Sequence, residues 1–361
     1  MALADYFSVT YAEARSRFLE AAAAAGAAQK SYPHPLKGPD GGELATDVAW
    51  FGPRDASRVL LLSSATHGVE GFCGSGCQVG FLSTGWQDGL PPDTGLLYVH
   101  AHNPHGFAHQ RRVTEENVDL NRNFADFKQP LPANPGYDEI HPWLVPADWE
   151  GPARSKADAA ITGYIEEHGM FAFQAALSGG QYNHADGIFF GGQEKTWSRR
   201  TIEALAEEWL GQCKHLAVID FHTGLGPRGF GELIWSDLPH GVGYDRARAW
   251  LGDEVKSPEA GDSVSAVVKG TIKSGYAQAV PGAEATIIAI EYGTLPPLDV
   301  LQALRADNWL HLHGEIDSDL GRAIKRDIRA AFYGEDEEWN AMVWERAQEV
   351  TGKVLRGLTG D

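Results

Sequence analysis

The sequence contains few cysteines, no long apolar run, and fewer basic than acidic residues. Its three cysteines, Cys73, Cys77 and Cys213, cannot all pair within one chain, which argues against a disulfide framework. Lys and Arg number 30 against 49 Asp and Glu, and the net charge of −19 disfavours binding to nucleic acid or to an anionic membrane. No apolar run approaches the roughly 20 residues of a membrane span, and the first residues lack the basic and apolar regions of a secretion signal. We therefore expect a cytoplasmic protein.

What the chain does contain is the pattern of an α/β protein. Its 361 residues are 43% hydrophobic, which is enough for a substantial core. Short apolar runs that predict buried strands alternate with amphipathic stretches that predict helices. A capping box at Thr10 and Glu13 begins a predicted helix within residues 8–26, and residues 298–357 predict C-terminal helices. We expect these terminal helices to pack on a single domain spanning residues 1–361.

Two stretches between these helices have weaker patterns. Residues 128–156 hold many of the prolines and predict an irregular excursion over the surface of the domain. Residues 172–176 predict a short strand, and the Gly- and aromatic-rich segment 178–192 predicts a loop.

Polar residues follow four of the predicted strands, at the point where each apolar run ends. His67 and Glu70 follow the run 58–66, a loop over 103–122 follows the run 95–101, and His222 and Glu291 each follow a later run. Each of these ends, taken alone, could be an ordinary strand terminus. If the strands are parallel, all four ends lie along one edge of a sheet, which is where α/β proteins place their active sites.

The residue types at this edge are those of a zinc hydrolase. His67 and Glu70, three residues apart, can offer a ring nitrogen and a carboxylate oxygen to one zinc ion. His222 can supply the third protein ligand from a distant segment and leave the fourth position for water. Water at such a site still needs a base, and Glu291, at the tip of a buried strand, is placed to take its proton.

The loop over 103–122 supplies cations and a partner for a histidine. Arg111 or Arg112 can stabilise a developing oxyanion, and we favour Arg112, because adjacent side chains in an extended segment point in opposite directions. Asn121 and Arg122 can bind a substrate carboxylate, although a structural salt bridge is the alternative role for Arg122. Asp119 can accept the second ring N–H of a zinc-bound histidine.

Five short motifs carry these residues, in the order His67-Gly-Val-Glu70, Asn103-Pro-His-Gly-Phe107, Val118-Asp-Leu-Asn-Arg-Asn123, Ile219-Asp-Phe-His222 and Ile290-Glu-Tyr-Gly293. Their set and order resemble the zinc carboxypeptidase superfamily, which also includes aspartoacylase and succinylglutamate desuccinylase. The resemblance implies a three-layer α/β/α fold with a mixed, largely parallel central sheet. It also implies one zinc ion on the two histidines and Glu70, carbonyl polarisation by an arginine of the second loop, carboxylate binding by Asn121 and Arg122, and general acid/base catalysis by Glu291.

The chain departs from the carboxypeptidase pattern in its substrate-binding parts. Carboxypeptidases carry a mobile tyrosine before the catalytic glutamate, and Tyr276 is the nearest candidate here. The loop 178–192 matches no specificity pocket. We expect a zinc-dependent, carboxypeptidase-like metallopeptidase that hydrolyses an amide bond beside the free carboxylate of a small peptide. The alternatives are a deacylase of N-acyl amino acids and a catalytically silent zinc-containing binding protein, against which the intact Glu291 argues.

Overall fold

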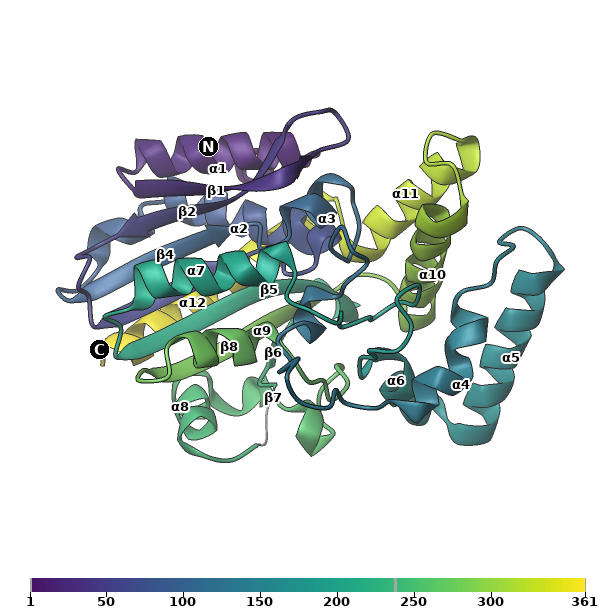
Figure 1. The fold of residues 1–361 in the computed structure, drawn as a ribbon. Helices are drawn as coiled ribbons and strands as arrows, with labels where there is room; N and C mark the ends of the chain where they lie inside the picture. The colour runs from purple at the N-terminus through teal and green to yellow at the C-terminus, as the bar shows by residue number, and fades with distance from the viewer. Residues whose placement is uncertain (1, 237–238, 361) are drawn as a thin grey trace.

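The fold is built on one sheet, to which eight strands of the described residues contribute. The computed structural model describes residues 2–236 and 239–360. The strand order is β1-β2-β4-β3-β5-β8-β6-β7 (Figure 1). Strands β4, β3, β5 and β8 are parallel to one another, whereas β2 and β6 pair antiparallel with β4 and β8. The mixed, largely parallel sheet is therefore confirmed. The strand bounds are β1 Ala28–Lys37, β2 Glu43–Phe51, β3 Arg58–Ser63, β4 Thr94–His100, β5 His215–Arg228, β6 Gly231–Ile234, β7 Val255–Lys256 and β8 Glu284–Gly293.

Helices cover both faces of this sheet and make three layers. Side chains alternate along a strand, so Leu60 and Leu62 of β3 contact one hydrophobic cluster while Leu61 contacts the other. The first cluster is closed by α1 (Tyr11–Ala24), α2 (Gly71–Ser83), α8 (Val242–Leu251) and α12 (Glu337–Thr359). The second is closed by α7 (Trp197–Leu210) and α9 (Ile272–Ala279). The predicted three-layer α/β/α class is confirmed.

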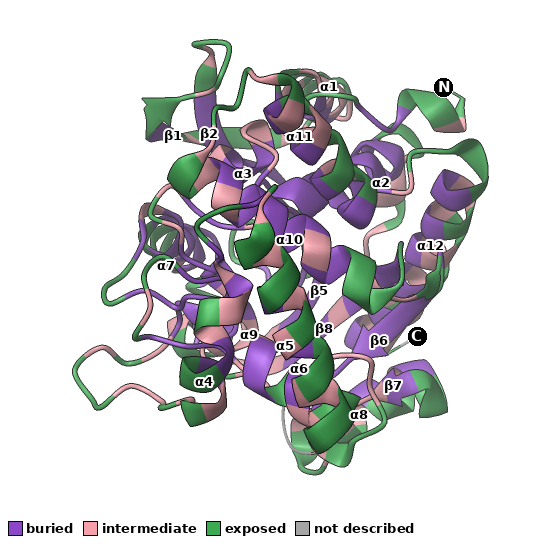
Figure 2. Cartoon of the chain, turned by 90° about the vertical axis from the view of Figure 1, so that its right-hand side faces the viewer, coloured by how far each residue is buried: buried purple, intermediate pink, exposed green. Residues whose placement is uncertain are grey.

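A further group of helices lies beyond the carboxyl edge of the parallel strands (Figures 1 and 2). These helices form their own apolar cluster, which includes Tyr137, Phe173, Val300 and Ile328. Val69, between two of the predicted metal ligands, is buried in the same cluster, so this group anchors the segment that follows β3. The helices are α4 (Pro135–Leu144), α5 (Pro152–His168), α6 (Met170–Ser178), α10 (Pro297–His313) and α11 (Asp319–Phe332).

Two local expectations are wrong, whereas the terminal helices are confirmed. Residues 172–176, predicted as a strand, lie inside α6, and the supposedly irregular stretch 128–156 contains α4 and the start of α5. The α4 helix has its own cap, because the Asn134 side chain accepts a hydrogen bond from the N–H of Tyr137. At the N-terminus, Thr10 caps α1 by accepting from the N–H of Glu13.

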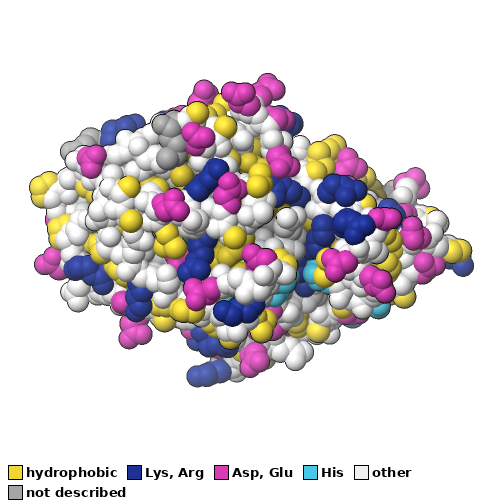
Figure 3. Space-filling model, turned by 90° about the horizontal axis from the view of Figure 1, so that it is seen from above, with side chains coloured by type: hydrophobic (Ala, Val, Ile, Leu, Met, Phe, Trp, Pro, Cys, Tyr) yellow, Lys and Arg dark blue, Asp and Glu magenta, His cyan; other side chains and the backbone are white. Residues whose placement is uncertain are grey.

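The surface carries charges of both signs. Figure 3 shows acidic and basic side chains mixed over the face seen from above. Within residues 2–236 and 239–360, no helix has the length and apolar character to cross a membrane.

Candidate metal centre and active site

His67, Glu70 and His222 converge at the carboxyl edge of the sheet. His67 precedes and Glu70 ends the short 3-10 helix η2 (Gly68–Glu70), which follows β3, and His222 lies on the neighbouring strand β5. Their ligand atoms all lie within 4.8 Å of one another, and all three residues are buried. The Glu70 carboxylate lies between the two rings, with Oε1 2.8 Å from Nδ1 of His67 and Oε2 3.1 Å from Nδ1 of His222.

The rings of His67 and His222 each contact a second carboxylate through Nε2. Nε2 of His67 lies 3.1 Å from Oδ1 of Asp119, and Nε2 of His222 lies 2.5 Å from Oδ2 of Asp220. Burial opposes ionisation of Asp119, yet Arg112 and His67 hold the pKa of Asp119 well below its usual range. Each ring is therefore turned so that its Nδ1 atom faces Glu70, as in histidines oriented for a metal ion.

These residues fit a divalent metal ion. The Nδ1 atom of His67 is buried and has no hydrogen-bond partner, although it lies 2.8 Å from a carboxylate oxygen of Glu70. A buried polar atom without a partner is costly, and a metal ion bound by both groups removes that cost. Two imidazole nitrogens and one carboxylate oxygen also match the three protein ligands of catalytic zinc sites.

Glu291 lies beside this group on the next strand. It is the direct partner of His222 in the parallel pairing of β5 and β8, and its Oε1 accepts a hydrogen bond of 3.0 Å from the N–H of Leu225. Burial and the negative charge of Glu70 raise the pKa of Glu291 to about 7, against the opposing effects of His222, the Leu225 N–H and Arg112. A carboxylate of this pKa can accept and release a proton near neutral pH.

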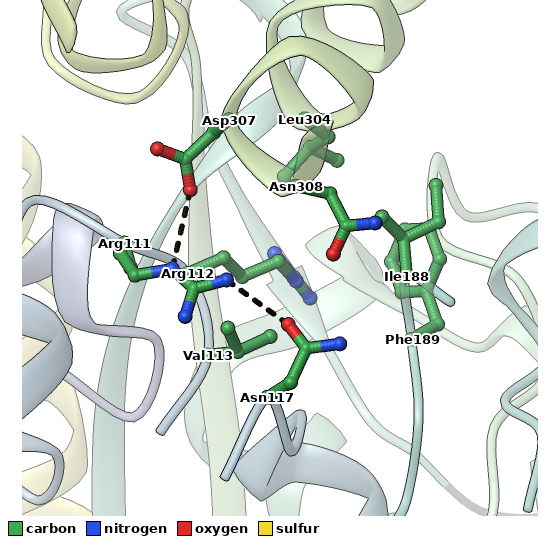
Figure 4. A pocket seen from close by; sticks show the side chains of 9 residues that line it. All are labelled: Arg111, Arg112, Val113, Asn117, Ile188, Phe189, Leu304, Asp307 and Asn308. Atoms are coloured by element: carbon green, nitrogen blue, oxygen red, sulfur yellow. Dashed lines mark hydrogen bonds and ion pairs between the residues drawn. The ribbon is translucent and has the colours of Figure 1, made fainter. Parts of the chain in front are cut away.

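The side chains of Arg111 and Arg112 contact different groups. Arg112 donates to Oε1 of Glu70 at 2.9 Å and to Oδ2 of Asp119 at 3.1 Å, so it lies beside the group of His67, Glu70 and His222. Arg111 faces α10 instead: it donates to Oδ1 of Asn117 and pairs with Asp307 at 3.5 Å (Figure 4). A cavity of about 20 Å³ is lined by both arginines and by residues of α10, among them Leu304 and Asn308. The geometry therefore distinguishes the two residues that the sequence left as alternatives.

Asn121 and Arg122 lie close to Asp119 but are already engaged. Arg122 is buried and donates to the carbonyl oxygens of Asn121 (3.0 Å) and Ser178 (2.6 Å), whereas its nearest contact with Asp119 is 3.9 Å. Burial, supported by the charge of Arg112, lowers the pKa of Arg122. The Asn121 side-chain oxygen accepts from the N–H of Ile272 at the start of α9. Arg122 thus contacts mainly carbonyl groups, and its Nε atom has no hydrogen-bond partner.

The structure does not bring Tyr276 to the site with the other predicted residues. Tyr276 is fully buried in the cluster under α7 and α9, and its hydroxyl lies 2.8 Å from Nε2 of His102. The enclosed side chain contacts His102 and none of His67, Glu70 or His222 in this structure. We therefore correct the expectation that Tyr276 takes the place of the mobile carboxypeptidase tyrosine.

Two residues of the site were not predicted from the sequence. Asp220 lies two positions before His222, and the alternation of side chains along a strand was the available signal that both face the same side. Phe189 packs over the cations, with its ring centre 5.2 Å from the Arg112 guanidinium carbon and 5.7 Å from that of Arg122. Its φ of 56° is unusual for a bulky residue. No sequence signal separates it from an ordinary packing residue.

This fold and this site define an α/β protein with a buried His–Glu–His group that could hold a metal ion at the carboxyl edge of its sheet. The chain belongs to the family described as "Protein of unknown function (DUF2817)", which it matches over residues 7–346. No curated protein matched the chain.

Several solved structures are similar to the chain and come from the superfamily that its motifs resemble. Carboxypeptidase A from Helicoverpa armigera is 12% identical, with 91% of this chain and 75% of that chain covered and a TM-score of 0.44. Bovine thrombin-activatable fibrinolysis inhibitor is 10% identical, with 98% of each chain covered and a TM-score of 0.48. A succinylglutamate desuccinylase from Silicibacter is 14% identical, with 85% of this chain and 66% of that chain covered and a TM-score of 0.37. At these identities the likeness concerns the fold alone.

Proposed function

We propose that this protein is a zinc-dependent hydrolase of an amide bond beside a free carboxylate. The observation that carries the proposal is the buried His67, Glu70 and His222 group with Glu291 directly beside it on the next strand. A structural metal site uses four protein ligands, whereas this group offers three, which leaves room for a reacting molecule.

The proposed roles follow from the contacts of each residue. The two histidines and Glu70 would hold the zinc ion, which when bound supplies Lewis acidity to water and to a carbonyl group. Glu291 accepts a proton from the attacking water and returns it to the leaving amine, because burial keeps its pKa near neutrality. Arg112 supplies positive charge to the oxyanion that develops on the substrate carbonyl. Arg122, whose Nε atom has no hydrogen-bond partner within the protein, binds the substrate carboxylate.

A deacylase of N-acyl amino acids is the second candidate. The specific observation in its favour is the enclosed Tyr276, since the mobile tyrosine expected of a carboxypeptidase has no counterpart at that position. Both candidates cleave an amide bond next to a carboxylate, so they differ in the acyl group rather than in the chemistry.

A substrate panel with two variants tests the proposal. Zinc-loaded protein is offered peptides and N-acyl amino acids, and the products are identified by mass spectrometry. Glu291→Gln should lower turnover by roughly 100-fold or more with its metal content unchanged, because it keeps the shape and removes the base. His222→Ala should lose one bound zinc ion per chain. Normal turnover by Glu291→Gln, or full zinc content in His222→Ala, would contradict the assigned roles.

A further inference from the structure

A second group of metal-ligating side chains lies apart from the first, in the helical region beyond the sheet. His141 of α4 and His184 and Asp186 of the loop after α6 place their ligand atoms within 4.8 Å of one another. The two rings are stacked, with centres 3.9 Å apart and planes at 23°. Two imidazoles and a carboxylate are again the donor types that zinc prefers, here from two segments that are distant in sequence.

The loop residues of this group are held in place through their backbone. Gln181, almost fully buried, accepts from the N–H of His184 at 2.8 Å and donates to the carbonyl of the same residue at 2.8 Å. Asn308 of α10 donates to the carbonyl of Asp186 at 2.8 Å. Ligands fixed by such contacts lose little freedom when they bind an ion, which favours binding.

His141 makes no short hydrogen bond through its ring nitrogens. Its Nδ1 atom is buried without a hydrogen bond, and its Nε2 atom lies 3.4 Å from Oδ1 of Asp186, too far for a strong one. His184, by contrast, has its Nε2 atom 2.8 Å from Oδ1 of Asp138. In the first site, each histidine likewise contacts a second carboxylate through Nε2. An ion bound at Nε2 of His141 and at Asp186 would replace this long contact with direct bonds to the ion.

We propose that His141, His184 and Asp186 form a second site for a divalent metal ion of the zinc type, which fastens the loop 181–191 to α4. The ordinary alternative is a pair of surface His–Asp contacts, one on each ring. It accounts for the close contact of His184 with Asp138, but the contact of His141 with Asp186 is too long for a strong hydrogen bond, although the two rings are stacked beside that carboxylate.

The position of the loop gives this second site a consequence for the first. The loop carries Phe189, whose ring lies against both Arg112 and Arg122. The carbonyl of Ile188, one residue earlier, accepts from the hydroxyl of Tyr137 on α4 at 2.7 Å. An ion that joins the loop to α4 therefore stabilises the arrangement in which Phe189 covers the two cations.

Zinc titration of the full-length protein tests the site. After treatment with a chelator, the parent should bind two zinc ions per chain. His184→Ala and Asp186→Asn should each bind one over the same range of zinc concentration. His313→Ala, which removes an exposed histidine of α10, is the matched control and should still bind two. Thermal unfolding of each variant shows that it is folded. If the parent binds one ion, or if both loop variants still bind two, the second site does not exist.

A background without the first site separates the two proposals. In the variant with His67 and His222 both replaced by alanine, one zinc ion should still bind, and adding His184→Ala should abolish that binding. Zinc should also slow hydrogen exchange of residues 181–191 in this background, and should not slow it once His184 is replaced. If the background variant binds no zinc, the second site does not exist. If it binds zinc without slower hydrogen exchange, the ion does not hold the loop on α4. Neither outcome depends on the activity of the first site.

Discussion

The raised pKa of Glu291 carries a cost in the stability of the folded protein. Burial and the charge of Glu70 raise its pKa from 4.5 to about 7 in the folded, metal-free protein. Between these values the folded state binds the proton more tightly than the unfolded chain, so the free energy of unfolding falls as the pH rises. This penalty is complete above about pH 7 and disappears below the ordinary pKa.

Glu291→Gln should therefore stabilise the metal-free protein at alkaline pH. We expect the free energy of unfolding to rise by roughly 1 to 3 kcal/mol at pH 8, with the gain shrinking toward pH 5. Urea unfolding in the presence of a chelator, at several pH values, measures it. Glu345→Gln, at an exposed position of α12, is the control and should show no such trend. A gain that is the same at pH 5 and pH 8 would contradict the raised pKa.

Arg122 should determine the preference for a free carboxylate in the substrate. Blocking that carboxylate as an amide should lower kcat/KM by roughly 30- to 900-fold, or about 2 to 4 kcal/mol, the scale of losing a buried charge-assisted pair. Arg122→Ala should remove the preference while the protein stays folded. Kinetics with matched free and blocked substrates test this prediction. Equal hydrolysis of both by the parent would rule out a carboxylate-binding role for Arg122.

Single residues of the site were predictable where a motif ties residue type to spacing. His67, Glu70 and His222 come together as the sequence suggested, and Asp119 lies behind a ring as expected. Tyr276 was interpreted wrongly, because its place before Glu291 in sequence says nothing of its burial. Phe189 was not predicted, since its contact with two arginines depends on the conformation of a loop, which no local sequence pattern determines.

At the scale of elements, the contact of η2 with α3 (Pro104–Ala108) fixes the first two ligands. Gly68, between them, leaves no room for a side chain, since an added Cβ would lie 2.1 Å from the carbonyl carbon of Gly106 and 2.3 Å from the nitrogen of Phe107. Both are backbone atoms, which cannot rotate away.

Gly68→Ala should therefore push η2 off α3 and disturb His67 and Glu70 together. We expect a loss of roughly 2 to 3 kcal/mol in the free energy of unfolding and weaker zinc binding at the first site. Gly163→Ala, in α5 with open space around it, should instead be neutral or stabilising by up to about 1 kcal/mol. Denaturant unfolding and zinc competition compare the two variants. Unchanged zinc affinity in a folded Gly68→Ala protein would contradict this account.

The elements themselves were predictable to different degrees. The central strands are short apolar runs and the terminal helices are capped and amphipathic, so both were found. Residues 172–176 have a largely apolar composition that suits a buried strand as well as a helix. Their packing in the cluster beyond the sheet determines that they are helical. Strand β1 was not predicted, because Pro33 and Pro35 weaken the pattern of a strand in its sequence. It is a strand because its backbone pairs with β2.

At the scale of the whole molecule, the net charge of −19 opposes the local cations of the site. An anionic substrate is repelled at long range and is attracted only once it is near Arg112 and Arg122. The value of kcat/KM for a free-acid substrate should therefore rise by a few-fold between about 10 mM and about 200 mM salt, whereas that of the neutral amide should stay constant. Steady-state kinetics over this range measure both. A fall for the acid would mean that the local cations prevail at long range.

Strand β5 pairs with β3, which precedes it in sequence, and with β8, which follows it, so its two edges become paired at different times during synthesis of the chain. A nascent chain that has reached β5 already contains His67, Glu70 and His222, but Glu291 arrives only with β8. Until then, the β8 side of β5 has unpaired backbone groups, which is the kind of edge on which incomplete chains aggregate. The proposed metal site can therefore be complete before the sheet is, and would link β5 to the segment after β3 while Glu291 is still being translated.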